Sequence, residues 1–131
     1  MEAFPPFPEK LIDTEKIDTG TFYIYPGFVI GIISEGANLK LEQLSSLVLL
    51  YEKYFSTKDF VYISYRVNSY SIDPTVYPYL LEIKTLKGIA VVTEKESFRQ
   101  NFQIEKVFYS GNIRIFPTIL EAISWANSMV D

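Results

Sequence analysis

The sequence predicts an α/β protein with a mainly parallel central sheet of about five strands, an antiparallel first hairpin and four helices. Three observations indicate this class. Short runs of β-branched and aromatic residues alternate with longer segments of helical periodicity. The links between these segments are short, and a Pro-Gly pair separates the first two apolar runs. Such alternation is typical of parallel strands joined by right-handed crossovers.

The chain begins with a segment rich in Pro, Asp and Thr, and we interpret residues 1–21 as an N-terminal arm that can end in an edge strand. Residues 22–131 are expected to form a single domain, since a chain of this length buries one hydrophobic core. Residues 22–25 and 28–34 are its first predicted strands. Pro26-Gly27 lies between them and favours a tight turn, because proline presets the first turn angle and glycine accepts the second.

The middle of the chain alternates between helical and extended patterns. Residues 38–55 have the apolar spacing of an amphipathic helix, with Asn38 as its expected cap. Residues 60–65 are β-branched and aromatic, which predicts a strand. Residues 74–86 return to helical spacing, and Pro74 suits the first turn, where its missing amide hydrogen costs no hydrogen bond.

The last part of the chain repeats this alternation. Residues 88–93 and 112–116 are predicted to be core strands, and residues 94–109 and 117–130 the third and fourth helices. Thr118 followed by Glu121 fits a capping box at the start of the last helix. The third helix carries an aromatic stripe that we expect to pack in the core rather than bind a cofactor: Phe98, Phe102, Phe108 and Tyr109.

The composition excludes several classes of function. The net charge of −4 and the scattered Lys and Arg residues argue against a nucleic-acid partner, which requires a clustered positive face. The chain has no cysteine and no histidine, which removes disulfides, thiol catalysis, a Ser-His-Asp triad and the commonest metal ligands. The first residues lack the pattern of a signal peptide, and the apolar runs are too short for a membrane span. We therefore expect a cytoplasmic protein without a metal or cofactor.

One loop stands out as a candidate binding site. The stretch "YRVNSYSIDPTVYPYL", residues 65–80, connects a predicted core strand to a predicted helix. Ligands of open α/β sheets bind outside the carboxyl ends of strands, and helix starts favour anions. Tyrosines surround this loop in the sequence and can line a pocket or an interaction face. The candidate binding residues are Arg66, Asn68, Ser69, Tyr70, Ser71, Asp73 and Thr75.

A structural interpretation explains part of the same pattern. Asp73 before Pro74 is an ordinary N-cap followed by an ordinary first helical residue. Arg66 can pair with a carboxylate, and the serines can satisfy loop amides. Glu94 and Glu96 can join the same rim, although the helix dipole alone favours acidic residues in a first turn. Both interpretations remain open at this point.

The order and lengths of these elements resemble the STAS family, and within it the small SpoIIAA-like domains also described as STAS/SEC14-like. The resemblance covers the chain from about residue 20 to its end. It is carried by "FVIGIISEGANLKLEQLSSL", "YISYRVNSYSIDPTVYPYL" and "IRIFPTILEAISWA". It implies a central sheet covered by helices and a bacterial regulatory module that acts through the strand-to-helix loop.

The chain departs from the pattern of STAS anti-sigma antagonists at the residue that their partner kinase phosphorylates. Their loop reads roughly Asp-Ser-Ser-Gly, and "IDPTVY" aligns with it, so that Asp73 matches the aspartate. Pro74 then occupies the position of the phosphorylated serine, and Val76 that of the glycine. Proline has no hydroxyl group, so the family's phosphorylation switch cannot operate at that position.

Three functions follow for testing. The first is a non-enzymatic module that binds a protein partner through residues 66–75, with a homodimer also possible. The alternative is a carrier of a small or lipid-like molecule, suggested by the SEC14-like resemblance and the aromatic fraction of 16%, which requires an apolar cavity beside residues 62–79. The third is an enzyme with Asp73 or Glu94 as a base, for which the sequence offers no sign of a buried carboxylate.

Overall fold

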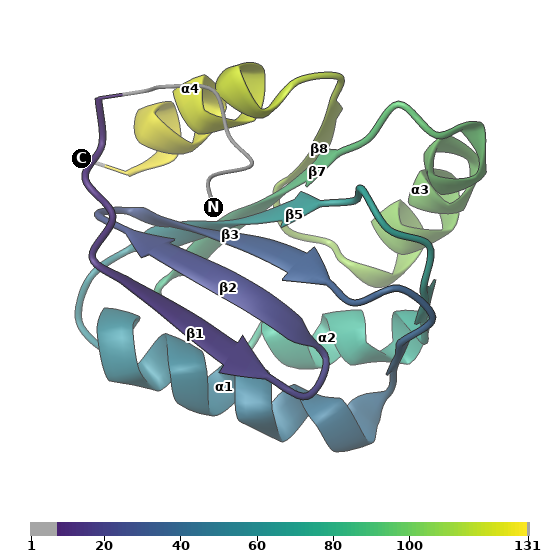
Figure 1. Ribbon diagram of the computed structural model, residues 1–131, viewed down its shortest axis with the longest axis horizontal. Helices are drawn as coiled ribbons and strands as arrows, with labels where there is room; N and C mark the ends of the chain where they lie inside the picture. Colours follow the sequence, from purple (N-terminus) through teal and green to yellow (C-terminus); the bar gives the residue numbers. More distant parts are fainter. Residues whose placement is uncertain (1–7, 131) are drawn as a thin grey trace.

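The computed structural model of the chain describes residues 8–130, which form a six-stranded sheet with helices on both faces (Figure 1). The spatial order of the strands is β1-β2-β3-β5-β7-β8. Strands β1, β2 and β3 are antiparallel, whereas β3, β5, β7 and β8 are parallel. The strands are β1 (Asp13–Ile17), β2 (Gly20–Tyr25), β3 (Phe28–Ile33), β5 (Phe60–Tyr65), β7 (Leu86–Val92) and β8 (Ile113–Phe116). The predicted α/β class with an antiparallel first hairpin is confirmed.

The first hairpin turns at the expected Pro-Gly pair. Gly27 has a φ of +84°, a left-handed conformation that glycine adopts without steric cost. The predicted edge strand is β1, which pairs with β2 and adds a sixth strand to the sheet. Part of the predicted arm thus belongs to the sheet, and residues 1–7 of that arm lie outside the described residues. The division into an arm and one domain stays a prediction.

The helices divide unequally between the two faces of the sheet (Figure 1). One buried cluster joins the sheet to α1, α2 and α3, and a second cluster joins the opposite face to α4. This arrangement follows from three successive right-handed crossovers to adjacent strands, which place their helices on the same face. The helices are α1 (Leu41–Phe55), the short 3₁₀ turn η1 (Pro74–Val76), α2 (Tyr77–Leu80), α3 (Glu96–Phe108) and α4 (Ile119–Met129).

The central strands β3, β5 and β7 are covered on both faces. Val29, Ile30, Val61 and Ile63 have no exposed surface, which explains why these strands appear in the sequence as continuous apolar runs. Full burial of one such side chain contributes about 1.5–3 kcal/mol to folding. The sheet is therefore a rigid base for the loops at its carboxyl end.

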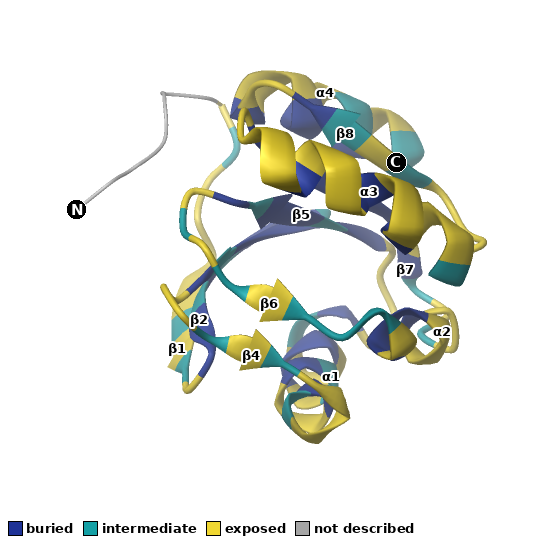
Figure 2. Ribbon diagram, turned by 90° about the vertical axis from the view of Figure 1, so that its right-hand side faces the viewer, coloured by how far each residue is buried: buried dark blue, intermediate teal, exposed yellow. Residues whose placement is uncertain are grey.

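A second, smaller sheet lies beyond that end. The two-residue strands β4 (Asn38–Leu39) and β6 (Ser71–Ile72) pair in parallel, and Figure 2 shows them side by side in the foreground, between α1 and α3. Gly36 N donates to Ser69 O (2.7 Å). Ser71 N donates to Ala37 O (3.0 Å) and Asp73 N to Leu39 O (2.8 Å). We call residues 34–40 and 67–73 together the strap.

Two details of the sequence prediction are wrong. The helix expected over residues 74–86 is replaced by η1 and the single turn α2, and Leu86 instead begins β7, where it pairs with Phe60. After α2 the chain forms turns in which Glu82 N donates to Tyr79 O and Ile83 N donates to Leu80 O. These i→i+3 hydrogen bonds end the helix rather than extend it. Asn38 does not cap α1 either, because it lies in β4; the Gln43 side chain accepts a hydrogen bond from Lys40 N at that helix start (2.9 Å).

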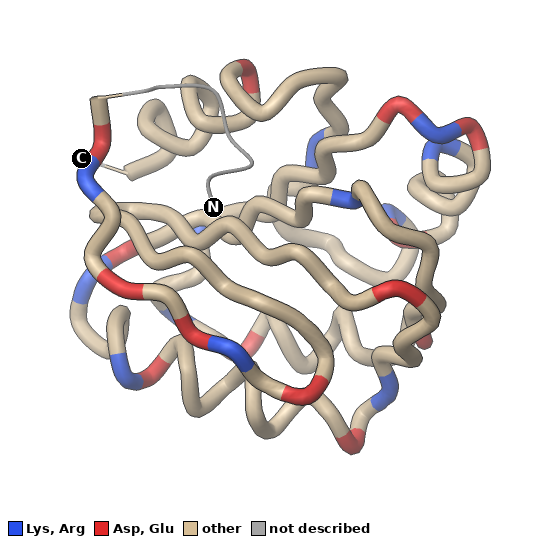
Figure 3. Tube along the Cα trace, viewed as in Figure 1, with Lys and Arg blue, Asp and Glu red and all other residues tan. Residues whose placement is uncertain are grey.

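The charged residues are dispersed over the part of the chain that the structure describes (Figure 3). Within residues 8–130, no group of three or more acidic residues is placed to hold a metal ion. No helix in the same range is long and apolar enough to cross a membrane.

Candidate functional site

Arg66, the first candidate residue, follows β5 directly and points into the molecule. Its backbone N donates to Val92 O (2.9 Å), which continues the pairing of β5 with β7 by one residue. Its exposure is only 2%, so the guanidinium lies beneath the strap rather than on the surface. The loop therefore begins with a buried charge, and the structure shows what compensates it.

The Arg66 guanidinium is surrounded by polar side chains from three further segments. Nη1 donates to Oε2 of Glu105 on α3 (2.8 Å), and Nε donates to Oγ of Ser64 on β5 (3.0 Å). Nη2 donates to the Tyr77 hydroxyl of α2 (3.3 Å). The Phe98 ring lies 5.1 Å below the guanidinium carbon, within cation–π range. Arg66 thereby joins β5, α2 and α3 at one point.

The ion pair between Arg66 and Glu105 is almost completely removed from water, with side-chain exposures of 1% and 6%. Burial opposes the charge on Arg66, but Tyr70, Tyr77 and Glu105 around it favour the guanidinium, and on balance the pKa of Arg66 lies above its ordinary value. Arg66 therefore stays charged at every pH at which the protein is folded. Its positive charge is matched by one carboxylate inside the fold.

Tyrosines form the rest of this polar cluster. Burial is the main cause that raises the pKa values of Tyr51, Tyr62, Tyr70 and Tyr77 above the ordinary tyrosine value of 10.0. Their hydroxyl groups consequently remain protonated at neutral pH, and that of Tyr77 accepts the hydrogen bond from Arg66 Nη2. The Tyr70 hydroxyl lies 3.3 Å from Ser64 Oγ, which connects it to Arg66.

A cavity of about 40 Å³ lies between this cluster, α1 and the strap. This volume holds roughly two or three water molecules. Ser64, Arg66, Tyr70 and Tyr77 form a hydrogen-bonded polar group in the cavity lining, and apart from Lys40 and Gln43 the rest of the lining is apolar or aromatic. The wall residues are Leu39, Lys40, Gln43, Leu44, Leu47, Tyr51, Tyr62, Ile72, Val76, Leu80 and Ile89.

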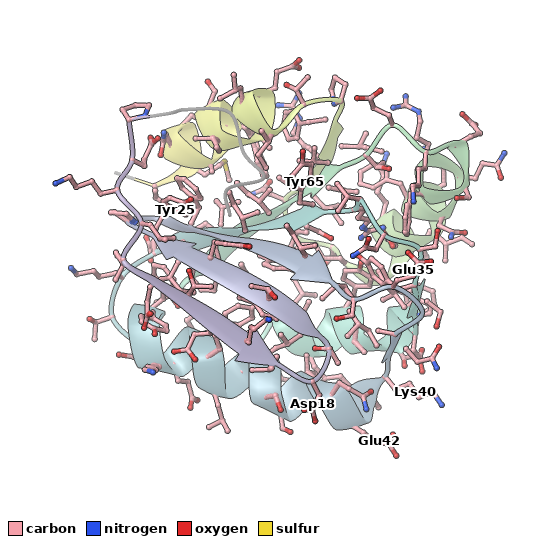
Figure 4. All side chains as sticks on the ribbon, viewed as in Figure 1. Asp18, Tyr25, Glu35, Lys40, Glu42 and Tyr65 are labelled. Carbon is pink, nitrogen blue, oxygen red and sulfur yellow. The ribbon has the colours of Figure 1, made fainter. Side chains whose placement is uncertain are left out.

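The next predicted residues hold the strap in place. Asn68 Nδ2 donates to Ile33 O (2.8 Å), which ties the loop to the end of β3. Ser69 N donates to the carboxylate of Glu35 (2.9 Å), and the Ser71 hydroxyl donates to the Asn38 side chain. Glu35 and Lys40 lie at the strap end of the molecule in Figure 4. The side chains of Ser69 and Ser71 are exposed, whereas Tyr70 between them points inward.

Asp73 and Thr75 form the predicted cap. The Asp73 carboxylate accepts hydrogen bonds from Thr75 N (3.0 Å) and Thr75 Oγ1 (2.7 Å) at the start of η1. These two hydrogen bonds, that from the hydroxyl first, hold the pKa of Asp73 below its ordinary value. Capping thus accounts for the position of this pair, and a binding role for either residue stays a prediction.

No protein-family model matches the chain, and no curated protein matches it in sequence. Among solved structures, it is similar to the crystal structure of an uncharacterised DUF3478-family protein with a SpoIIAA-like fold from Shewanella loihica. The match has a TM-score of 0.53 at 12% identity, and it covers 95% of this chain and 99% of that chain. The fold is SpoIIAA-like. Identity at this level shows the fold alone.

The SpoIIAA-like fold brings only some of the predicted residues together. Arg66 and Tyr70 meet in the buried cluster, whereas Asn68 bonds to the end of β3. The partners of Ser69, Ser71, Asp73 and Thr75 lie within the strap and η1. Tyr62 and Tyr77 line the cavity, but Tyr65 lies with the second core and Tyr79 is 50% exposed. The tyrosines around the loop therefore do not form one surface.

Glu105 is the residue that the sequence analysis missed, although a signal for it exists. It follows Phe98 and Phe102 at helical spacing, so it lies on the buried stripe of α3 that the aromatic residues define. A carboxylate on an apolar stripe requires a positively charged or hydrogen-bonding partner. Arg66, which follows a core strand, was a candidate for that partner. Glu94 and Glu96, the acidic candidates that were considered, are exposed in the SpoIIAA-like structure.

Proposed function

We propose that this protein is a non-enzymatic module that binds a small amphipathic molecule in the cavity beneath the strap. The observation that carries the proposal is a mainly apolar cavity lining that contains one hydrogen-bonded polar group, Ser64, Arg66, Tyr70 and Tyr77. Leu44, Leu47 and Ile72 suit a hydrocarbon group, and Arg66 and Tyr70 suit a polar head. Binding pockets combine apolar walls with a few converging polar groups in this way.

This function agrees better with the geometry than binding of a protein partner through Arg66 and Tyr70. Arg and Tyr contribute strongly to protein interfaces when a partner can cover them. Arg66 is 2% exposed and already bonded to Glu105, Ser64 and Tyr77, so a partner that docks on the strap does not reach it. A molecule inside the cavity does.

The volume of about 40 Å³ requires the strap to move when a larger ligand enters. Its two strands are only two residues long, and few backbone hydrogen bonds join them. Short segments with few buried contacts open at lower free energy than core strands. The strap is therefore the part of the wall that we expect to yield.

The test is a titration of ¹⁵N-labelled protein with hexan-1-ol, followed by NMR. Residues that line the cavity are expected to shift, and the variant Leu47→Trp, which fills it, is expected to lose the response. Leu49→Trp is the matched control, because Leu49 lies on the same helix but is 66% exposed, against 8% for Leu47. Circular dichroism of both variants checks that they fold.

Shifts confined to the cavity and lost only in Leu47→Trp support the proposal. An unshifted spectrum of the unmodified protein up to the solubility of the alcohol contradicts it. Equal responses of the two variants contradict it as well, since they place the alcohol outside the cavity.

A second function rests on the exposed edge of the strap. Asn68, Ser69 and Ser71 of the strap and Thr75 of the adjoining η1 are held by hydrogen bonds at the carboxyl end of the sheet, and preorganised loops often serve as interaction sites. Native mass spectrometry of the protein from its own cells separates the two functions. A bound second protein that is lost in Ser71→Arg favours the interaction module, and a small mass that is lost on denaturation favours the ligand.

A further inference from the structure

A groove of about 230 Å³ lies between β6 and α3, and it shares Tyr70 and Ile72 with the lining of the cavity. We call it the α3 groove. Its walls are mainly apolar, with two polar side chains and one carboxylate among them. The residues that line it are Tyr70, Ser71, Ile72, Pro74, Phe98, Asn101, Ile104 and Glu105.

Glu105, which lines this groove, carries an unpaired acceptor. Its Oε2 accepts the hydrogen bond from Arg66, but its Oε1 is buried and has no hydrogen-bond partner within residues 8–130. Glu105 as a whole is 4% exposed. A buried carboxylate oxygen without a donor is strongly unfavourable, so a molecule that supplies one gains free energy on binding.

We propose that the α3 groove is a second binding site, which takes an uncharged molecule with a carboxamide head and an apolar body. An amide N–H of the head donates to Glu105 Oε1. Asn101 lies at the same groove and offers a side-chain amide to the carbonyl of the head. Phe98, Ile104 and Pro74 form the apolar surface for the body. Glu105 does not line the cavity beneath the strap, so this site is distinct from the first.

The charge balance of the cluster determines that the head is uncharged. Arg66 and Glu105 already neutralise each other at 2.8 Å, and Arg66 remains charged in the folded protein. An ammonium at Oε1 adds a second cation beside Arg66, in surroundings with little screening. A carboxylate instead faces Glu105 with like charge. An uncharged donor satisfies the oxygen without either repulsion.

The ligand must part the walls of the groove to reach Oε1, since that atom is itself buried. Tyr70 and Ile72 are the side chains that line both the groove and the cavity, and both are only half-buried. We expect Tyr70 to make this movement, because it lines both spaces and is joined through Ser64 to the Arg66 cluster.

Three aromatic probes of similar shape test the inference by NMR on the full ¹⁵N-labelled chain: benzamide, benzylammonium and benzoate. Benzamide is expected to shift amides on β6 and on the Phe98–Glu105 side of α3, and to bind about tenfold tighter than either ion. Ile104→Trp, which narrows the groove, is expected to weaken benzamide binding. Val107→Trp is its matched control, because Val107 lies one turn further on α3, is 80% exposed and does not line the groove.

Glu105→Gln tests the chemistry of the head group. This variant keeps an acceptor for Arg66 and turns the other position into a donor, so the preference for benzamide over benzoate is expected to fall. Where the variant does not fold, the three probes and the tryptophan pair still decide the question. Tighter binding of an ion than of benzamide overturns the inference, as does an equal effect of the two tryptophans. No shift with any probe also overturns it and leaves water as the partner of Oε1.

Discussion

Arg66 and Glu105 form an ion pair whose surroundings differ completely from those of the pair between Lys53 and Glu15. The first pair has side-chain exposures of 1% and 6%, whereas Lys53 is 61% exposed. In water, an ion pair gains little, because solvent and salt screen it. Inside the fold, each charge depends on the other, and removal of one leaves the other without compensation. The structural consequence of one substitution is therefore much larger at Arg66 than at Lys53.

Glu105→Leu is expected to lower the free energy of unfolding by about 3–5 kcal/mol, because Arg66 is left buried without its carboxylate. The double variant Arg66→Met with Glu105→Leu is expected to recover most of this loss, since both charges are replaced by apolar side chains. Urea denaturation of the two single variants, Arg66→Met and Glu105→Leu, and of the double variant gives a double-mutant cycle that measures the coupling between the two side chains.

Lys53→Met is the control for this cycle, and we expect it to leave stability almost unchanged. Additive effects of the two substitutions at Arg66 and Glu105 would contradict the coupling that the 2.8 Å ion pair implies.

The sequence could predict which residue types belong to the candidate site. It could not predict in which direction their side chains point. Arg66 and Tyr70 were identified as candidates, but a loop sequence does not indicate which side chains point inward. Glu105 was overlooked because it is distant in sequence, although it lies on the predicted stripe of α3. Asp73 could be predicted as a cap because its partner is two residues away. The short-range hydrogen bond of Asp73 was thus predictable, whereas the long-range ion pair between Arg66 and Glu105 was not.

At the scale of elements, the longer periodic segments were predicted well. Helices α1, α3 and α4 begin and end within a few residues of their expected positions, because each carries one continuous apolar stripe. The helix over residues 74–86 was wrong, since Leu86 matched the helical spacing but pairs with β5 instead. The strap was not predicted at all. Two-residue strands carry no detectable period, and their partner lies in a distant loop.

The cap of α4 provides a test at this scale. Thr118 Oγ1 accepts a hydrogen bond from Glu121 N (3.2 Å), which is one half of the predicted capping box, whereas the Glu121 carboxylate accepts from the Thr118 hydroxyl. Thr118→Ala is expected to lower the free energy of unfolding by about 1 kcal/mol, because it leaves an amide at the helix start without a partner. Thermal denaturation measures the effect, and Thr118→Ser is the control that retains the hydroxyl. A loss of equal size in both variants would show that the hydrogen bond is not its cause.

At the scale of the whole molecule, the tyrosines connect stability to pH. Burial raises the pKa values of Tyr51, Tyr62, Tyr70 and Tyr77 above 10.0, the value expected once the chain unfolds. The folded protein therefore keeps hydroxyl protons that the unfolded chain releases in alkali. Stability from these groups is complete below pH 10 and is lost as the pH rises through their folded values.

We accordingly expect the free energy of unfolding to fall steeply between about pH 10 and pH 12. Urea denaturation across this range measures the slope, and tyrosinate absorbance is expected to rise together with unfolding. The variant Tyr77→Phe is expected to show a smaller slope. Stability that stays constant across this range would mean that the hydroxyl groups titrate freely in the folded protein.

The register of the strap has a consequence for the order of folding. The same sequence separation joins Phe28 to Val61 in the main sheet and Asn38 to Ser71 in the strap, so the two segments that lead from the last β3–β5 pair, Gly31 with Ser64, to the strap are equal in length. Once β3 and β5 have paired, the strap residues already face their partners, and its closure requires little further loss of chain entropy. We therefore expect the two strands of the strap to pair after the rate-limiting step of folding. Substitutions such as Ser71→Ala are then expected to accelerate unfolding and leave the refolding rate unchanged in stopped-flow kinetics.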